Sequence, residues 1–338
     1  MRKSILLPLL LTACSGDGEE ATYHLVPDFA DRATPVTCAP ADLGEVAIEE
    51  LRAATDTSFV VLDAAQRRVT EFSDDLRAIW SLEYDEYGPA AVDRPVSAAL
   101  LADSAVAIVA RGGLKLVILG RDGRLIHAER LEFVPHAVAA TGDELLITAV
   151  PMGGSPGSLL FRFSGGAMEE VAVPPREYAD MLVGALGNQA AVETLADGDA
   201  LVVHRLLAPR AFRVAADRAT VASVPLPTPD ATAERIPFVP RAPVTAAQSG
   251  DMLVPALAVS VDRSRDEVYL LTRSGREVDG RWQRAILRAD DHLGFLSAYT
   301  LDAMAVHMAI LPRRRAALVG DALDRIYLCR LDADTHAE

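Results

Sequence analysis

The feature that most constrains the fold is a recurring unit of two strands joined by a tight polar turn. In the first copy, the strand Arg68–Phe72 is followed by the turn Ser73–Asp75 and a second strand, Leu76–Trp80. Asp-Gly and Gly-Gly between apolar runs are typical of β-hairpin turns, because these residues tolerate positive φ. The other four copies turn at Arg121-Asp122-Gly123, Ser164-Gly165-Gly166, Ala216-Asp217-Arg218 and Asp290-Asp291.

An apolar strand precedes each hairpin, and the spacing of these strands predicts the architecture. With a sixth copy near the C-terminus, they start at residues 59, 106, 145, 201, 268 and 316, which are separations of 47, 39, 56, 67 and 48 residues. These separations are near the length of a four-stranded propeller blade, with insertions in two copies. Continuous apolar runs such as Phe59–Leu62 fit strands buried on both faces between neighbouring blades. The sequence therefore predicts an all-β, six-bladed β-propeller.

The last blade has only three strands, because its pattern runs out at Asp332. The segment Thr22–Val26 is left over at the N-terminus, and we expect it to dock as the outer strand of this blade, closing the ring and removing a bare edge. Cys38 would lie soon after that strand and Cys329 on its neighbour. In an oxidising compartment the two cysteines could form a disulfide, and two free buried thiols are the alternative.

The first fourteen residues predict export. Arg2 and Lys3 form a positively charged region, Ile5–Leu11 is a short apolar segment, and Leu11–Cys14 places small residues before a cysteine. This pattern resembles the bacterial lipobox, and the resemblance implies that Cys14 is lipidated and becomes the mature N-terminus. An ordinary signal peptide, or a buried strand, is the alternative. Ser15 is not the Asp that acts in this family as an inner-membrane retention signal, so the outer membrane is the expected destination.

The apolar segment is too short to cross a bilayer as a helix, and no other stretch approaches the roughly 20 apolar residues that a span requires. Attachment to the membrane would therefore rest on acyl chains. The expected organisation is a signal peptide at residues 1–13, a flexible tether at 14–21 and a single propeller domain at 22–338.

The repeats, above all Val60–Asp63 followed by Arg67–Phe72, resemble NHL-type and TolB-like six-bladed propeller repeats. The resemblance covers nearly the whole mature chain and implies the fold, but such repeats occur in proteins of many functions. With 33 basic and 48 acidic residues the net charge is −15. This charge argues against a nucleic-acid partner, which would require clustered Lys and Arg, and mildly favours cationic partners.

Four long segments fall where blades connect on one face of a propeller: residues 83–95, 174–188, 225–255 and 273–282. Loops on a rigid scaffold usually carry recognition, so this loop-rich face is the predicted binding surface. The second segment could accommodate a short helix. For any single residue, an ordinary solvated loop position is the alternative. The candidates on this face are Tyr84, Asp85, Tyr87, Arg94, Arg176, Tyr178, Arg241 and Trp282.

His136 and His307 are candidates for the central channel. Each lies nine residues before the apolar strand of its blade, at Leu145 and Ala316 respectively. An equal register would point both toward the axis, where they could bind a metal ion or act as acid and base near neutral pH. A register slip of one residue would turn one of them away, and ordinary hydrogen-bonded channel residues are the alternative. Asn188 is a third channel candidate.

Known catalytic motifs are missing from the sequence: it has no Gly-x-Ser-x-Gly elbow, no phosphate-binding loop and no His-Glu-x-x-His. Calcium-dependent lactonases and esterases of similar shape use Glu, Asn and Asp around the channel, and Asn188 is the only asparagine in this chain. We therefore expect a membrane-anchored, non-catalytic propeller that binds a protein or small ligand. The alternatives are a metal-dependent hydrolase or lactonase with a channel metal ion, and a structural subunit of an envelope assembly. No catalytic residue or cofactor is assigned.

Overall fold

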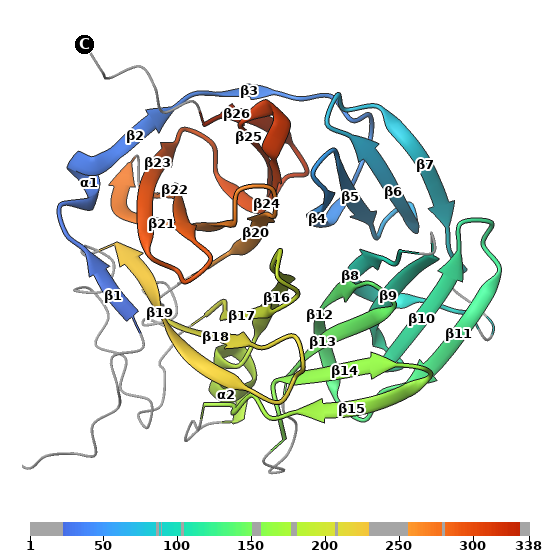
Figure 1. Cartoon of the computed structure of the whole chain (residues 1–338). Helices are drawn as coiled ribbons and strands as arrows, with labels where there is room; N and C mark the ends of the chain where they lie inside the picture. Colours follow the sequence, from blue (N-terminus) through green and yellow to red (C-terminus); the bar gives the residue numbers. More distant parts are fainter. Residues whose placement is uncertain are drawn as a thin grey trace, which may run out of the picture.

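Six small sheets radiate from a central axis and form a closed ring (Figure 1). The computed structural model describes residues 23–331, except 86–87, 89, 103–104, 151–156, 177–180, 207–208, 230–255 and 279–280. The ring confirms the predicted six-bladed β-propeller. Four of the predicted site residues lie outside the described part of the chain: Cys14, Tyr87, Tyr178 and Arg241.

In blades 1 to 3, four consecutive strands form each antiparallel sheet, with the first strand nearest the axis and the fourth at the rim (Figure 1). Blade 1 contains β4 (Ile48–Thr55), β5 (Ser58–Asp63), β6 (Arg68–Ser73) and β7 (Ala78–Glu83). Blade 2 contains β8 (Asp93–Leu100), β9 (Ala105–Gly112), β10 (Lys115–Gly120) and β11 (Leu125–Arg130). Blade 3 contains β12 (Val134–Thr141), β13 (Glu144–Val150), β14 (Leu160–Ser164) and β15 (Ala167–Val171).

Blades 4 to 6 each incorporate a strand from the N-terminal segment, which is a fifth strand in blades 4 and 5 and the fourth strand in blade 6. Blade 4 contains β16 (Ala190–Thr194), β17 (Ala200–His204), β18 (Arg210–Val214), β19 (Val221–Pro229) and β1 (Tyr23–Val26). Blade 5 contains β20 (Ala258–Asp262), β21 (Glu267–Val278), β22 (Arg281–Asp290), β23 (Phe295–Leu301) and β2 (Ala33–Val36). Blade 6 contains β24 (Ala305–Leu311), β25 (Ala316–Asp321), β26 (Ile326–Arg330) and β3 (Cys38–Pro40).

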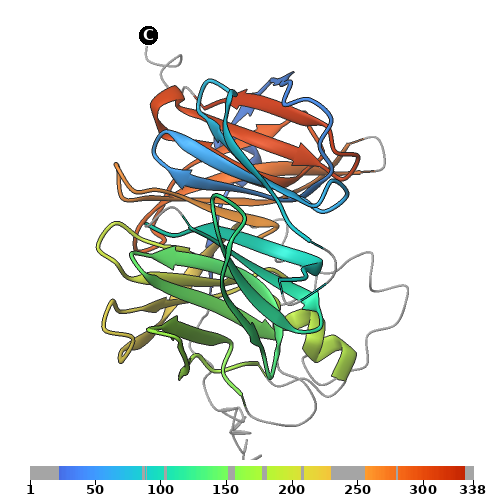
Figure 2. The ribbon, with the colours of Figure 1, turned by 90° about the vertical axis from the view of Figure 1, so that its right-hand side faces the viewer.

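The described helices are short: α1 (Phe29–Arg32), α2 (Met181–Gly187) and a single 3₁₀ turn, η1 (Pro312–Arg314). The helix α2 lies in the connection from blade 3 to blade 4, where the sequence could accommodate a helix, and it projects from one side of the ring in Figure 2. Within the described residues, no helix combines the length and the apolar character needed to cross a bilayer.

The apolar core is divided into six clusters, one between each pair of neighbouring blades. Strand β5 shows why, since Phe59 and Val61 pack toward blade 6 while Val60 and Leu62 pack toward blade 2. Alternate residues of a strand point to opposite faces, so a strand between two blades must be apolar on both. The second strands therefore read as continuous apolar runs, and they begin within one residue of the predicted starts.

The N-terminal segment adds one strand to each of three blades. The prediction that an N-terminal strand closes the ring is correct, but the predicted residues are wrong. The strand that completes blade 6 is β3, which pairs antiparallel with β26. The segment predicted for that position forms β1 instead, which pairs in parallel with β19 at the rim of blade 4. Strand propensity favours Tyr-His-Leu-Val over Cys-Ala-Pro. Chain connectivity determines the pairing instead, because β3 is followed directly by β4, the inner strand of blade 1.

A disulfide joins the two ends of the ring. Cys38 and Cys329 lie directly opposite each other in the pairing of β3 with β26 and are bonded through their sulfur atoms. Cys38 is thus on the closing strand rather than after it. The bond spans 291 residues of sequence, so it restricts the unfolded chain strongly, and disulfides typically contribute about 2–4 kcal/mol to stability.

Candidate functional site

A small cavity lies on the propeller axis, near the points where the inner strands begin. Its volume is about 80 Å³, and residues from the inner strands of all six blades line it. The inner strands begin on the face where the outer strands end, so this cavity is at the centre of the loop-rich face. Its charged and imidazole side chains are Glu49, Glu50, Arg52, His136, Glu193, Arg205 and His307.

Both predicted channel histidines line this cavity, although they do not share a register. His136 lies where the pairing of β12 with β13 shifts, between Pro135 and Ala137. In blade 6 the corresponding shift falls at Val306, and His307 pairs with Gly320. The assumption of equal register is therefore wrong by one residue. The turn between β24 and β25 is longer than the turn between β12 and β13. Counting nine residues back from the apolar strand therefore reaches a different register position in the two blades.

Burial keeps both imidazoles neutral. Burial, together with the positive charges of Arg205 and Arg111, lowers the pKa of His136 to about 3, against hydrogen bonds with Gln189 and Ala190. Burial likewise lowers the pKa of His307 to about 4, with Arg205 acting in the same direction. A general acid or base works best with a pKa near the operating pH. Neither histidine meets that requirement at neutral pH.

His307 and Arg205 present polar atoms to the cavity. His136 is held in place, with Nδ1 3.2 Å from the carbonyl oxygen of Ala190 and Nε2 3.2 Å from Oε1 of Gln189. By contrast, neither the His307 imidazole nor the Arg205 guanidinium makes a hydrogen bond or a close ion pair with any described residue. Burial, together with the charge of Arg111, lowers the pKa of Arg205, and Glu50 opposes this shift.

Arg52 crosses the channel and separates this cavity from a second one. Its guanidinium donates to the carbonyl oxygens of Val138 and Val192 and lies 3.0 Å from a carboxylate oxygen of Glu193. The second cavity, of about 320 Å³, lies toward the other ends of the inner strands and is also lined by Arg52. Arg52 and Glu193 are both less than 10% exposed, so they form a buried ion pair that ties blades 1, 3 and 4 together.

Glu50 makes a parallel tie to blade 2. One of its carboxylate oxygens accepts a hydrogen bond from Ser97 Oγ at 2.7 Å, and the other accepts one from the Ala98 amide at 2.7 Å. Ser97 Oγ in turn accepts a hydrogen bond from the amide of Val138 in blade 3. Burial raises the pKa of Glu50, and the charge of Arg52 opposes this.

Sequence reasoning missed Glu50, Arg52, Glu193 and Arg205. A signal for the first two was present, because Glu50-Leu51-Arg52 places two charges two residues apart in a strand that precedes the apolar run at Phe59. Charges at that spacing lie on the same face of a strand. A charged pair on an inner strand would have indicated a polar channel. Arg205 had no such signal, because it follows β17 in an irregular segment.

Some of the described binding-face candidates are buried and others are exposed. Tyr84 is 5% exposed, and its hydroxyl donates to the carbonyl oxygen of Asp63, so it belongs to the core. Asp85 is exposed on the connection into β8, and Arg94 is exposed near the start of β8. Trp282 is half-buried on β22, with the Arg273 guanidinium 6.0 Å from its ring centroid. Its segment, expected as a loop, instead extends the β21–β22 hairpin.

Asn188 and Arg176 act together in the connection between blades 3 and 4. The Asn188 carboxamide accepts a hydrogen bond from the Arg176 amide at 2.8 Å and donates to the carbonyl oxygens of Arg176 and Gly184 at 3.0 Å. Asn188 is buried and is not among the residues that line the channel cavity. It fastens the loop to the end of α2.

No protein-family profile and no curated protein matches the sequence. Solved structures do match in fold. A member of the DUF4221 family from Bacteroides vulgatus has a TM-score of 0.61 at 6% identity, over 88% of this chain and 96% of that one. A Bacteroides fragilis protein described as a predicted exported protein has a TM-score of 0.55 at 9% identity, over 91% and 97%. A streptogramin B lyase has a TM-score of 0.50 at 9% identity, over 88% and 97%. At these identities the likeness shows the propeller fold alone.

Proposed function

We propose that this protein is a non-catalytic binding propeller that recognises a protein or small ligand on its loop-rich face, with one group of the ligand entering the channel cavity. The observation that carries the proposal is the pair formed by His307 and Arg205. Both line the cavity, and neither side chain has a hydrogen-bond partner among the described residues. Both residues are half-buried, so their polar atoms are available to a ligand group that enters the cavity.

The volume of the cavity limits the size of the ligand group that enters it, and the lining residues limit the chemistry of that group. At about 80 Å³ it is far smaller than the roughly 300–1,000 Å³ pockets that enclose drug-sized ligands. Only a small group fits, and the surrounding loops would contact the remainder. Arg205 offers guanidinium donors and a neutral His307 offers one donor and one acceptor. A carbonyl or carboxylate group on the ligand matches this set.

A metal-dependent hydrolase or lactonase is the second candidate, because two histidines line the cavity. The described residues contain no group of three or more His, Cys, Asp or Glu side chains placed to hold a metal ion. The pKa values of His136 and His307, about 3 and about 4, also favour binding over acid–base catalysis. We therefore place binding first.

The binding proposal is tested by a thermal-shift screen of small carboxylates, amides and peptides against the purified protein. Ligands that stabilise the wild type are expected to bind at least tenfold more weakly to Arg205→Gln, because loss of a charged hydrogen bond is worth about 1.5–3 kcal/mol. Arg276→Gln is the matched control, since Arg276 is exposed on the β21–β22 hairpin and the charge change is the same. Ligands that bind Arg205→Gln and His307→Leu as tightly as the wild type would contradict the proposed site. Turnover of esters or lactones with added Ca²⁺, Zn²⁺ or Mn²⁺, lost in His307→Leu, would establish the hydrolase instead.

We further propose that Cys14 carries acyl chains that anchor the propeller in the cell envelope. The described chain begins with β1 at the rim of blade 4 (Figure 1), and nine residues of extended chain reach at most about 30 Å. An anchor there would hold the propeller by its rim and leave both faces accessible.

Cys14→Ser is expected to move the protein from the membrane fraction to the soluble fraction and to abolish metabolic labelling with palmitate. The Cys38→Ser, Cys329→Ser double variant is the control, because it also removes cysteines but leaves the lipid-accepting position intact. Membrane association that persists in Cys14→Ser would refute the anchor.

A further inference from the structure

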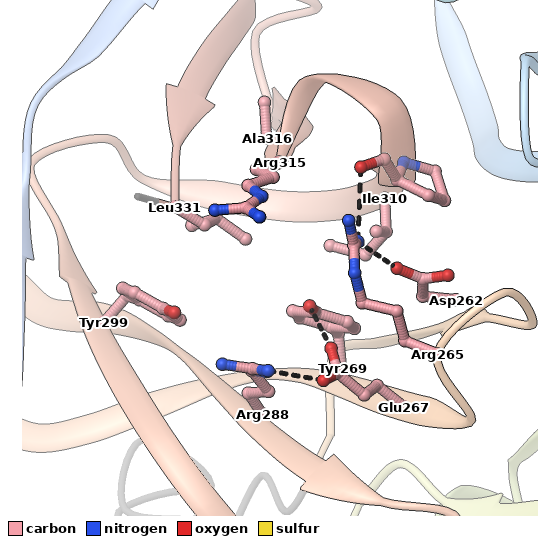
Figure 3. Close-up of a pocket in the computed structure, with 11 residues that line it drawn as sticks. Asp262, Arg265, Glu267, Tyr269, Arg288, Tyr299, Ile310, Arg315, Ala316 and Leu331 are labelled. Carbon is pink, nitrogen blue, oxygen red and sulfur yellow. Dashed lines mark hydrogen bonds and ion pairs between the residues drawn. The ribbon is translucent and has the colours of Figure 1, made fainter. Parts of the chain in front are cut away.

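A second pocket lies between blades 5 and 6, on the face opposite the long loops. Its volume is about 210 Å³. It is bounded by the turn from β20 to β21, the turn from β24 to β25, and side chains of β21, β22 and β23 (Figure 3). First strands end and second strands begin on this face, so the pocket is separate from the channel cavity.

The pocket is positively charged in a protein whose net charge is −15. Three guanidinium groups line it, from Arg265, Arg288 and Arg315, against the two carboxylates of Asp262 and Glu267. The lining therefore carries one net positive charge. Arg313 is exposed beside it on η1, where the neighbouring Arg314 pairs with Asp75 at 3.7 Å.

Two of these arginines are fixed in place by acidic partners. Arg265 donates to Asp262 Oδ2 at 2.6 Å and to the carbonyl oxygen of Pro312, across the junction of the blades, at 3.2 Å. Glu267 accepts hydrogen bonds from Arg288 and, at 2.8 Å, from the Tyr269 hydroxyl. Burial raises the pKa of Glu267, but these hydrogen bonds outweigh it and lower the pKa overall, so the carboxylate stays charged and holds Arg288.

Arg288 has donor capacity that its partners do not use. Its Nη2 donates to Glu267, and no hydrogen bond within the described residues uses its Nη1. An oxygen of an anion in the pocket can accept a hydrogen bond from that nitrogen. Figure 3 shows the Arg288 and Arg315 side chains and the Tyr299 ring directed at the same space. Tyr299 is 2% exposed to solvent, so the group that meets it would be well enclosed.

From this arrangement we propose that the pocket between blades 5 and 6 binds a small oxyanion, either a free anion or the anionic group of a larger molecule. Arginine is suited to this role because its planar fork matches carboxylate and phosphate oxygens and remains charged. Asp262 and Glu267 position Arg265 and Arg288 rather than bind the ligand, because like charges repel. The site is independent of the channel cavity.

The test is isothermal titration of the purified full-length protein with inorganic phosphate and with citrate, at constant ionic strength set by chloride. We expect saturable binding of at least one probe, weakened at least tenfold in Arg288→Gln and in Arg315→Gln. Arg315 is exposed, so its substitution keeps the test valid if Arg288→Gln is unstable. The tighter probe identifies whether the tetrahedral phosphate group or a planar carboxylate group fits better.

Two controls carry the same change of charge elsewhere. Arg281→Gln and Arg276→Gln, both on the exposed β21–β22 hairpin, are expected to bind the probes as the wild type does. The proposal is overturned if neither probe shows binding at about 10 mM. It is also overturned if the Arg281 or Arg276 variant loses as much affinity as the Arg288 variant. Loss of binding in Arg205→Gln, with wild-type binding in Arg288→Gln, would assign the anion to the channel cavity instead.

Discussion

Replacing Arg52 with methionine is expected to lower the free energy of unfolding by about 3–5 kcal/mol, the range measured when one partner of a buried ion pair is removed. The substitution leaves Glu193 buried without its counter-ion, and the carbonyl oxygens of Val138 and Val192 lose their donors. At roughly 2 °C per kcal/mol for a domain of this size, the Tm should fall by about 6–10 °C. Thermal and urea unfolding followed by circular dichroism measure both quantities.

A second substitution distinguishes the effect of losing the Arg52–Glu193 ion pair from the effect of losing the packing of the Arg52 side chain. In the Arg52→Met, Glu193→Gln double variant residue 193 no longer carries an unpaired charge, so at least half of the lost stability should return. Arg94→Met is the surface control, because the Arg94 side chain is 78% exposed, and it should change stability by less than about 0.5 kcal/mol. An Arg52→Met protein within 1 kcal/mol of the wild type would show that the cross-channel tie does not stabilise the ring.

Stability should also fall steeply as the pH drops from about 6.5 to 4. Burial lowers the pKa of His136 to about 3 and that of His204 to about 4, from an ordinary value of 6.5. Between these values the unfolded chain binds protons that the folded chain does not, so stability is complete above pH 6.5 and is lost toward pH 4. Two such histidines give a slope of up to ~3 kcal/mol per pH unit, and His307 acts in the same direction. Glu49 and Glu50 act in the opposite direction, because burial raises their pKa values.

The geometry of His204 explains why protonation is so unfavourable there. Its Nδ1 donates to the carbonyl oxygen of Gly187 at 2.9 Å, while Nε2 is buried without a hydrogen-bond partner. A proton on Nε2 would bury both a charge and an unsatisfied donor, which is costly in an apolar interior. Protonation of His204 is therefore expected to destabilise blade 4.

The measurement is urea unfolding at pH 7, 6, 5 and 4.5. His136→Gln should reduce the slope by about one proton, or ~1.4 kcal/mol per pH unit, and glutamine can still hydrogen-bond to Ala190. Val138→Ala is the matched control, because it removes buried apolar volume beside the channel and lowers stability without changing proton uptake. A free energy of unfolding that is constant from pH 6.5 to 4.5 would contradict the proposed neutral state of these histidines.

The site was predictable only in part. The sequence placed His136 and His307 near the start of their inner strands, and both line the channel cavity although their registers differ by one residue. It offered no means of pairing Arg52 with Glu193, since these residues are 141 positions apart and meet only because blades 1 and 4 face each other across the axis. Contacts across the ring depend on how many blades close it, which no local pattern encodes.

What the sequence alone determined is the local repeat. Apolar runs at Phe59–Leu62 and its five counterparts, with turn residues between the following strands, require hairpins whose second strands are buried on both sides, and a ring of six blades satisfies all of them. Which N-terminal strand closes the ring was decided by tertiary structure. The backbone edge of β26 accepts any strand that reaches it in the correct direction, so proximity to blade 1 selects Cys38–Pro40, and the more strand-like Tyr23–Val26 pairs with blade 4. The pocket of arginines between blades 5 and 6 has the same origin, because two turns that are unremarkable in sequence face one another only once the last two blades lie side by side.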